Sequence, residues 1–284
     1  MLKRHLTVGG ISLAVSCEEP VNLGGDLDRF VAPGDGGGGI PLRLERVNAL
    51  SERAYGRPVF ESGATWGMYG CPSGGKGATL TVPALRNGKR TMLSADFDDD
   101  FRKGTVFFRK NGEMYFLYPF LEVLTINILG TGRGVLLHAC CIDDNGEGYL
   151  FLGQSGAGKS TMAKLWDGKK GIRILSDDRV IVTAAGGGLI AHGTPWHGTA
   201  QYALNESVPL KRVFFISHAE KNRFSRVQGI RAVSELARTA FLPFWSRSGM
   251  EFSLDFLGRF ERCVNLFLLG FIPHESAVDF VRSM

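Results

Sequence analysis

The stretch that decides the fold spans residues 149–160 and reads Tyr149-Leu150-Phe151-Leu152-Gly153-Gln154-Ser155-Gly156-Ala157-Gly158-Lys159-Ser160. Its first four residues are apolar or aromatic and predict a buried β-strand. Its last eight fit the pattern G-x-x-x-x-G-K-[ST], which is typical of a phosphate-binding loop between a strand and a helix. The residues from Lys159 to Trp166 predict that helix, and Asp167-Gly168 should end it.

The chemistry of such a loop predicts a nucleotide site. Backbone N–H groups of the glycine-rich turn, together with the positive end of the helix dipole, would surround phosphate oxygens. Lys159 would reach the β- and γ-phosphates, and the Ser160 hydroxyl would coordinate Mg²⁺. We therefore expect ATP and Mg²⁺ to bind, with the nucleotide contacting Gly153, Gln154, Ser155, Gly156, Ala157, Gly158, Lys159, Ser160 and Thr161.

A second glycine-rich stretch, Gly70 to Gly77, is not expected to bind phosphate. It carries Lys76 but places Gly77 where the magnesium-binding hydroxyl belongs, and no helix pattern follows it. The phosphate loop is therefore assigned to residues 153–160.

Two adjacent carboxylates follow the loop. Ile172 to Leu175 predicts a short buried strand that ends in Ser176-Asp177-Asp178-Arg179, before the apolar run Val180 to Val182. A strand beside the phosphate-loop strand would bring Asp177 and Asp178 to the nucleotide, one as metal ligand and the other as general base, provided that the chain turns there. The alternative is a solvated Asp-Asp turn.

A histidine lies on the strand expected upstream. Val135 to Ile142 is rich in β-forming residues and is joined to the phosphate-loop strand by the polar segment Asp143 to Gly148, an arrangement typical of a hairpin. His138 could contact phosphate or metal from this strand, or it could be a satisfied core residue.

The order of these features resembles the catalytic domain of HPr kinase/phosphorylase and its relatives. That fold is similar to the nucleotide domain of ATP-dependent phosphoenolpyruvate carboxykinase. The resemblance runs from about Val135 to Val182 and is looser towards the C-terminus. It implies an α/β fold with a mixed sheet, and a catalytic group of His138, Lys159, Asp177 and Asp178, with Ser160 and Asp177 as metal ligands. The roles of the two aspartates stay open.

The sequence departs from the family pattern after the carboxylates. An Arg-Gly-Leu-Gly segment, associated with dephosphorylation, is missing, and His192 to Thr199 occupies its neighbourhood. The chain therefore looks more like the HPr-kinase-related proteins of uncertain substrate, some of which accompany peptide-modifying gene clusters and phosphorylate a precursor peptide. Trp196 could stack on a base or substrate, or pack in the core. His192 and His197 lack the partners of a zinc site.

Composition favours a cytoplasmic protein without nucleic-acid or membrane partners. The chain has 284 residues, a net charge of +5 at pH 7 and five cysteines without C-x-x-C spacing. Basic residues are scattered, although four arginines could bind an acidic substrate or be solvated, namely Arg223, Arg226, Arg231 and Arg238. No segment is apolar for long enough to span a membrane. Residues 1–17 superficially resemble a lipoprotein signal, but their alternation around Gly9-Gly10 predicts a β-hairpin.

We expect two regions, a β-rich segment over 1–125 and the nucleotide-binding domain over 126–284. The first should hold strands at 79–82, 105–108 and 114–117, a connection at 36–39, an acidic turn at 96–100 and a helix over 119–129. The second should add strands at 213–216 and 264–269, helices at 232–240 and 276–283, and a mobile aromatic segment at 241–250.

These features predict a kinase that transfers the γ-phosphoryl group of ATP to a hydroxyl, Ser or Thr, of a peptide or protein. A small-molecule kinase with the same site, or a non-catalytic nucleotide-binding regulator, are the alternatives. The family resemblance also allows a homo-oligomer.

Overall fold

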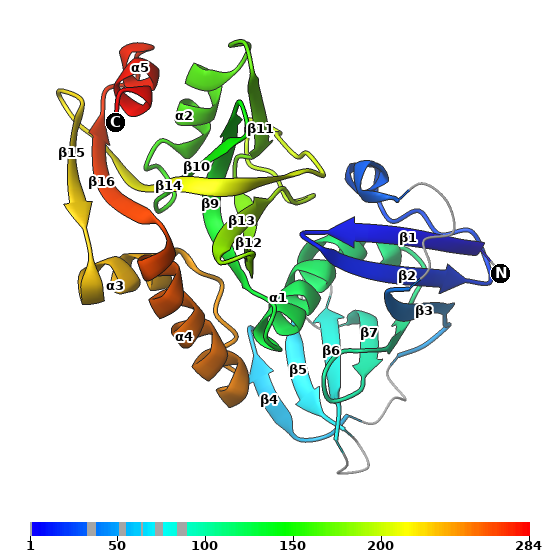
Figure 1. Ribbon diagram of the computed structural model, residues 1–284. Helices are drawn as coiled ribbons and strands as arrows, with labels where there is room; N and C mark the ends of the chain where they lie inside the picture. The colour runs from blue at the N-terminus through cyan, green and yellow to red at the C-terminus, as the bar shows by residue number, and fades with distance from the viewer. Residues whose placement is uncertain (1, 33–37, 51–54, 64, 72–75, 84–89) are drawn as a thin grey trace. The chain divides into compact units, whose positions relative to one another are not determined.

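The chain falls into two compact units, Met1–Thr131 and Gly132–Met284. The structure is a computed structural model that describes residues 2–32, 38–50, 55–63, 65–71, 76–83 and 90–284 (Figure 1). The division lies between Thr131 and Gly132 rather than at residue 125. The loop at 72–75 and part of the connection at 36–39 lie outside the described residues.

The first unit is built on one eight-stranded sheet. Its strand order is β1-β2-β3-β8-β7-β6-β5-β4. The strands are β1 (Leu2–Val8), β2 (Ile11–Cys17), β3 (Ile40–Arg46), β4 (Pro58–Glu61), β5 (Gly67–Gly70), β6 (Ala78–Pro83), β7 (Thr91–Phe97) and β8 (Gly104–Phe108). β3 is parallel to both β2 and β8, and the other neighbours are antiparallel.

The predicted N-terminal hairpin is confirmed. β1 and β2 pair around Gly9-Gly10, whose φ angles of 56° and 78° suit glycine. Alternate side chains such as Leu6, Leu13 and Val15 are buried, as the period of a half-buried strand requires. Residues 2–17 are therefore part of the folded sheet.

The segment 112–130 is helical except for a kink at Tyr118, whose backbone is extended, so the strand predicted at 114–117 is wrong. A 3-10 turn η2 (Gly112–Tyr115) leads into a π-helical segment η3 (Phe116–Leu121) and then into α1 (Glu122–Gly130). The aromatic residues that suggested a strand instead form a helical cluster, in which the Phe116 and Phe120 rings lie 5.2 Å apart. The helix expected over 119–129 is confirmed. Another 3-10 turn, η1 (Gly25–Phe30), precedes β3.

The second unit holds a strongly curled mixed sheet. Its strands are β9 (Val135–Asp144), β10 (Glu147–Leu152), β11 (Ile172–Ser176), β12 (Arg179–Ala185), β13 (Gly188–His192), β14 (Ser207–His218), β15 (Arg223–Val227) and β16 (Asn265–Phe271). One run of neighbours is β11-β9-β10-β14-β16-β15, and a second is β9-β12-β13-β14. The long strands β9 and β14 belong to both runs, so five strands close a ring.

β9 separates β10 from β11, which corrects the expectation that the carboxylate-bearing strand adjoins the phosphate-loop strand. Asn145 and Gly146, with φ of 54° and 90°, form a two-residue turn that forces β9 to pair with β10. The other edge of β10 is occupied by β14, which runs parallel to it. β11 therefore pairs with the free edge of β9.

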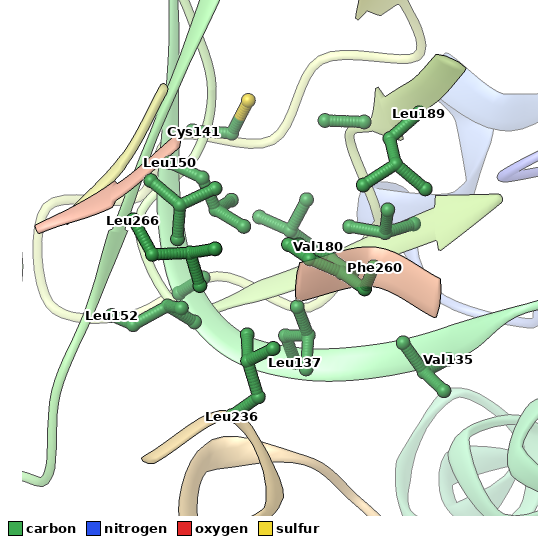
Figure 2. Packing of buried hydrophobic residues seen from close by; sticks show 14 of the residues in the cluster. Val135, Leu137, Cys141, Leu150, Leu152, Val180, Leu189, Leu236, Phe260 and Leu266 are labelled. Carbon is green, nitrogen blue, oxygen red and sulfur yellow. The ribbon is translucent and has the colours of Figure 1, made fainter. Parts of the chain in front are cut away.

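Two apolar layers cover this sheet. On one side α2 (Lys159–Trp166) and α5 (Ser276–Arg282) pack on Phe151, Phe214 and Phe271. On the other, α3 (Gly229–Thr239) and α4 (Arg247–Cys263) pack on a cluster that includes Leu137, Leu152 and Val180 (Figure 2). In Figure 1, α2 and α5 lie towards the carboxyl end of β16, and α3 and α4 lie towards its amino end.

Helix α4, which the sequence did not predict, begins at Arg247 and so includes only the last four residues of the aromatic segment expected over 241–250. Ser246 caps it by accepting a hydrogen bond from the Gly249 N–H at 3.2 Å. Phe256 and Phe260, four residues apart, bury their side chains on one face. The predicted helices α2, α3 and α5 and the strands at 213–216 and 264–269 are confirmed.

Three ion pairs fasten the hairpin end of β9 and β10. The buried carboxylate of Asp143 pairs with Arg173, and Arg282 donates to both oxygens of Asp144 at 2.7 and 3.0 Å. Lys211 donates to Glu147 at 2.7 Å. These pairs tie β11, β14 and α5 to the turn that fixes the hairpin.

In the part of the chain that the structure describes, no helix has the length and apolar character needed to cross a bilayer.

Candidate active site

The glycine-rich loop connects the carboxyl end of β10 to the first residue of α2, as the sequence predicts. Gly156 and Gly158 have φ of 84° and 102°, which disfavour side chains at both positions. A Cβ atom at Gly158 would also lie 2.7 Å from the Phe271 ring. Glycine is therefore required at 158 by both conformation and space.

The Ala157 N–H of the loop donates to the Gln154 carbonyl at 3.1 Å, but three other backbone donors of the loop have no protein acceptor among the described residues. Among the described residues, the N–H groups of Gly156, Gly158 and Lys159 donate to no carbonyl or side chain. Gln154, Ser155 and Gly156 are exposed, so the loop is open to solvent. Unpaired N–H groups at a helix N-terminus suit phosphate oxygens, so these residues fit the predicted nucleotide.

Lys159 lies at the base of the loop and is 6% exposed. Its Nζ donates to the carbonyl oxygens of Gly153 at 2.8 Å and Gln154 at 3.2 Å, which leaves one of its three donors for another acceptor. Burial lowers the pKa of Lys159, and the opposing charges of Asp178 and Asp177 limit that decrease. Lys159 is thus an oriented cation within electrostatic range of both carboxylates.

Asp177 is buried beneath the loop, with 1% of its surface exposed. Its Oδ2 accepts a hydrogen bond from the Ser160 hydroxyl at 3.2 Å and from the Ala200 N–H at 3.0 Å, and its Oδ1 accepts from the Gly198 N–H at 2.8 Å. The two predicted metal ligands, Ser160 and Asp177, are therefore in direct contact.

Asp178 faces a different set of partners. His138 Nε2 lies 3.0 Å from Asp178 Oδ1, and Arg179 pairs with Oδ2. Burial alone would raise the pKa of Asp178, but the hydrogen bond from His138 and the charge of Arg179 outweigh it and hold the pKa below its ordinary value. His138 is therefore a partner of Asp178 rather than an isolated core residue.

The chain turns between the two aspartates, as the sequence argument required. The Ser176 hydroxyl accepts from the backbone N–H groups of Asp178 at 3.3 Å and Arg179 at 3.2 Å. This turn at the end of β11 lets both carboxylates lie on the loop side of the sheet.

Two contributors to the site were missed from the sequence. The Arg179 guanidinium lies 5.1 Å from the centre of the Phe241 ring, and the His138 ring lies 6.3 Å from it. Phe241 reaches this position because its N–H donates to the Leu136 carbonyl at 2.9 Å. Arg179 follows Asp178 directly and could have been noticed, whereas a partner more than 100 residues from His138 carries no local signal.

The loop 192–200 supports Asp177 rather than a metal. A Cβ atom at Gly198 would lie 2.7 Å from Asp177 Oδ2, so glycine permits this close approach. Trp196 is 5% exposed, which favours core packing over stacking on a ligand. His192 Nε2 lies 2.9 Å from the Thr183 hydroxyl, and burial lowers the pKa of His192.

No group of three or more His, Cys, Asp or Glu side chains in the described residues could hold a metal by itself. Mg²⁺ commonly takes one or two protein oxygens and completes its shell with water and substrate phosphates. The Ser160 and Asp177 pair fits that kind of site.

A pocket of about 680 Å³ adjoins the loop. Gly153, Gln154 and Ala157 form one wall, and the ends of β14 and β16 form another. Two of the four arginines singled out in the sequence, Arg223 and Arg238, line it, whereas Arg226 and Arg231 do not. Arg238 pairs with Glu235, which also lines the pocket, at 3.3 Å.

The fold and the site define an α/β protein whose curled mixed sheet presents a glycine-rich loop beside paired carboxylates. A family model described as SynChlorMet cassette protein ScmC matches residues 120–261, half of the chain, and the chain belongs to this family. A similar solved structure is that of the Hpr(Ser) kinase/phosphatase from Coxiella burnetii. It is 15% identical, the match covers 52% of this chain and 96% of that chain, and the TM-score is 0.31. No curated protein matches the chain.

Proposed function

We propose that this protein is an ATP-dependent phosphotransferase that phosphorylates a Ser or Thr hydroxyl of a peptide or protein. The observation that carries the proposal is that two side-chain contacts lie beside one loop: Ser160 contacts Asp177, and His138 contacts Asp178. Open backbone donors and a buried lysine lie in the same loop. This combination offers phosphate binding, a metal position and a proton acceptor.

The contacts support different roles for the two aspartates. Asp177 accepts three hydrogen bonds, one of them from Ser160, and this contact supports a role for the two side chains as ligands of Mg²⁺. Mg²⁺, when bound, would neutralise charge on the β- and γ-phosphates. Asp178 is more exposed and is oriented by His138, so we assign it as the general base.

The reaction needs no further group. The acceptor hydroxyl oxygen attacks the γ-phosphorus, the bond from that phosphorus to the β,γ-bridging oxygen breaks, and ADP leaves. Asp178 accepts the hydroxyl proton, and Lys159 and the loop N–H groups stabilise the charge on the phosphate oxygens.

Sheet order supports the orientation of the nucleotide. The carboxylates follow β11, on the β9 side of β10, and the 680 Å³ pocket lies on the β14 and β16 side. A triphosphate along the loop with its γ end at Asp178 directs its nucleoside towards that pocket. Leu268, Leu269 and Phe215 supply apolar walls, and Gln154 and Arg238 supply polar groups.

The test is transfer of label from γ-labelled ATP with Mg²⁺, to hydroxyl-bearing peptides and to a small-molecule extract. Asp178→Asn should lower transfer about 10²–10⁴-fold while ATP still binds. Asp255→Asn removes an exposed carboxylate from α4 and serves as the matched control, which should transfer label like the wild type.

Each other outcome rejects part of the proposal. Label only in small molecules would make the protein a small-molecule kinase. ATP binding without transfer to either fraction would indicate a nucleotide-binding regulator, and absence of ATP binding would reject the nucleotide site.

A further inference from the structure

The first unit carries a basic pocket that the phosphotransferase proposal does not use. It has a volume of about 670 Å³ and is lined by four cationic side chains, Arg46, Arg90, Arg109 and Lys110. None of the lining residues that the structure describes is acidic. The pocket therefore concentrates positive charge in the β-rich unit, separately from the loop at 153–160.

Sheet topology explains why these cations gather. Arg46 ends β3, Arg109 and Lys110 follow β8, and Arg90 precedes β7. β3 is parallel to β8 and β7 is antiparallel to it, so the end of β3, the end of β8 and the start of β7 lie side by side. The four cations are therefore at the same end of three neighbouring strands. Two backbone hydrogen bonds join the strands at this end, from the Val47 N–H to the Phe108 carbonyl at 2.9 Å and from the Arg109 N–H to the Met92 carbonyl at 3.0 Å.

The charge of this cluster is only partly compensated. Arg46 pairs with Glu19 at 3.3 Å, and both side chains are largely exposed. Arg90, Arg109 and Lys110 form no ion pair with any other residue that the structure describes. Unpaired like charges at one end of neighbouring strands repel each other, and an anionic ligand would relieve that repulsion.

The dimensions indicate a ligand with several anionic groups. Neighbouring strands lie about 4.8 Å apart, so the cations of three adjacent strands spread over roughly 10 Å. One phosphate or carboxylate cannot contact all of them. Alternate side chains of an extended peptide are about 6.6 Å apart, which suits carboxylates placed every second residue.

The remaining lining residues favour a polypeptide over a nucleic acid. Asn48 and Asn111 offer amides that can both donate to and accept from a peptide backbone. Among the described lining residues none is aromatic, so bases would find no ring there on which to stack. We propose that this pocket binds an acidic segment of a polypeptide.

The test measures fluorescence anisotropy of a labelled peptide, acetyl-(Glu-Ala)₄-amide, with the full chain and without ATP. Arg90→Gln combined with Arg109→Gln should weaken binding at least 10-fold. Arg4→Gln combined with Arg43→Gln removes the same charge from exposed positions of the same unit and should change the Kd less than 2-fold. A (Gln-Ala)₄ peptide should bind at least 10-fold more weakly, and added salt should weaken binding of the acidic peptide.

Three results would overturn the inference. Equal losses in the two double variants would show that net charge, not the pocket, binds the peptide. Equal binding of the Gln peptide would remove the need for carboxylates. Tighter binding of a labelled single-stranded oligonucleotide, lost in the pocket variant, would change the ligand class. Because no step uses ATP, the result is independent of the proposed phosphotransferase, and unchanged thermal unfolding of both variants confirms folding.

Discussion

The two ends of strands β9 and β10 use charge in different ways. At the hairpin end, each carboxylate has a cationic partner from another element, as in Asp143 with Arg173 and Asp144 with Arg282. At the loop end, Lys159 donates to two loop carbonyls and keeps one donor for another acceptor, and the N–H groups of Gly156, Gly158 and Lys159 have no acceptor among the described residues. Ion pairs therefore stabilise the sheet at one end, whereas N–H groups without a protein acceptor at the other end can bind a ligand.

The largest effect should come from Lys159. Lys159→Ala removes the buried cation of the loop end, and we expect ATP affinity to fall about 10²–10³-fold because no other side chain of the loop is positively charged. Lys164→Ala removes an exposed cation from the same helix and should leave affinity within 2-fold. Isothermal titration calorimetry measures the ATP affinity of both variants. Equal losses of affinity would show that the loop lysine is no more important for ATP binding than the helix lysine.

The pocket beside the loop gives the next largest effect. Ser217→Trp places a large ring at the loop end of β14, where Ser217 lines the pocket, and should weaken ATP binding at least 10-fold. Binding of inorganic tripolyphosphate should change less than 2-fold, because it has no nucleoside. Ser207→Trp, at the opposite end of the same strand, is the control for both titrations. Equal weakening of both ligands by Ser217→Trp would contradict the proposed orientation.

Substitutions at the hairpin end should lower the stability of the fold rather than ATP affinity. Arg173→Ala leaves the buried Asp143 with the Gly146 N–H as its remaining donor, and we expect the free energy of unfolding to fall by about 1–3 kcal/mol. Arg259→Ala breaks an exposed pair with Asp255 and should cost less than about 1 kcal/mol. Urea unfolding measures both. A loss of ATP affinity in Arg173→Ala would show that the two ends are coupled.

The smallest effect that we expect is a change of the free energy of unfolding at acid pH, through Asp178. The pKa of Asp178 is lowered in the folded state, so its ionised form stabilises the fold above its unfolded pKa of about 4, and this contribution is lost as pH falls towards the folded pKa. The difference in unfolding free energy between wild type and Asp178→Asn should therefore stay constant above about pH 4 and shrink below it. A difference that grows on acidification would have the wrong sign.

Sequence reasoning succeeded where the determinants are local. The hairpin around Asn145-Gly146, the strand and helix that flank the loop, and the turn at Asp177-Asp178 all follow from a few adjacent residues.

It failed where distant segments meet or where weak helix formers are overridden by packing. Gly249, Ser253 and Gly258 lie inside α4 and obscured it, although Phe252, Phe256 and Phe260 recur every four residues. The placement of β9 between β10 and β11, and of Phe241 beside His138, depends on pairings that no short stretch encodes. Likewise, the basic pocket joins positions more than 40 residues apart.

The ring of β9, β12, β13, β14 and β10 has a consequence for how the molecule acquires its site. Its closing pair joins β10 to β14, about 60 residues later in the chain, and Phe241 joins β9 later still. Such non-local pairings pay loop-closure entropy before they gain contacts, which slows folding. We expect the pocket beside the loop, and the packing of Phe241 beside His138, to form only in the last stage of folding, so a chain emerging from the ribosome would hold an incomplete site until β14, α3 and β16 are in place.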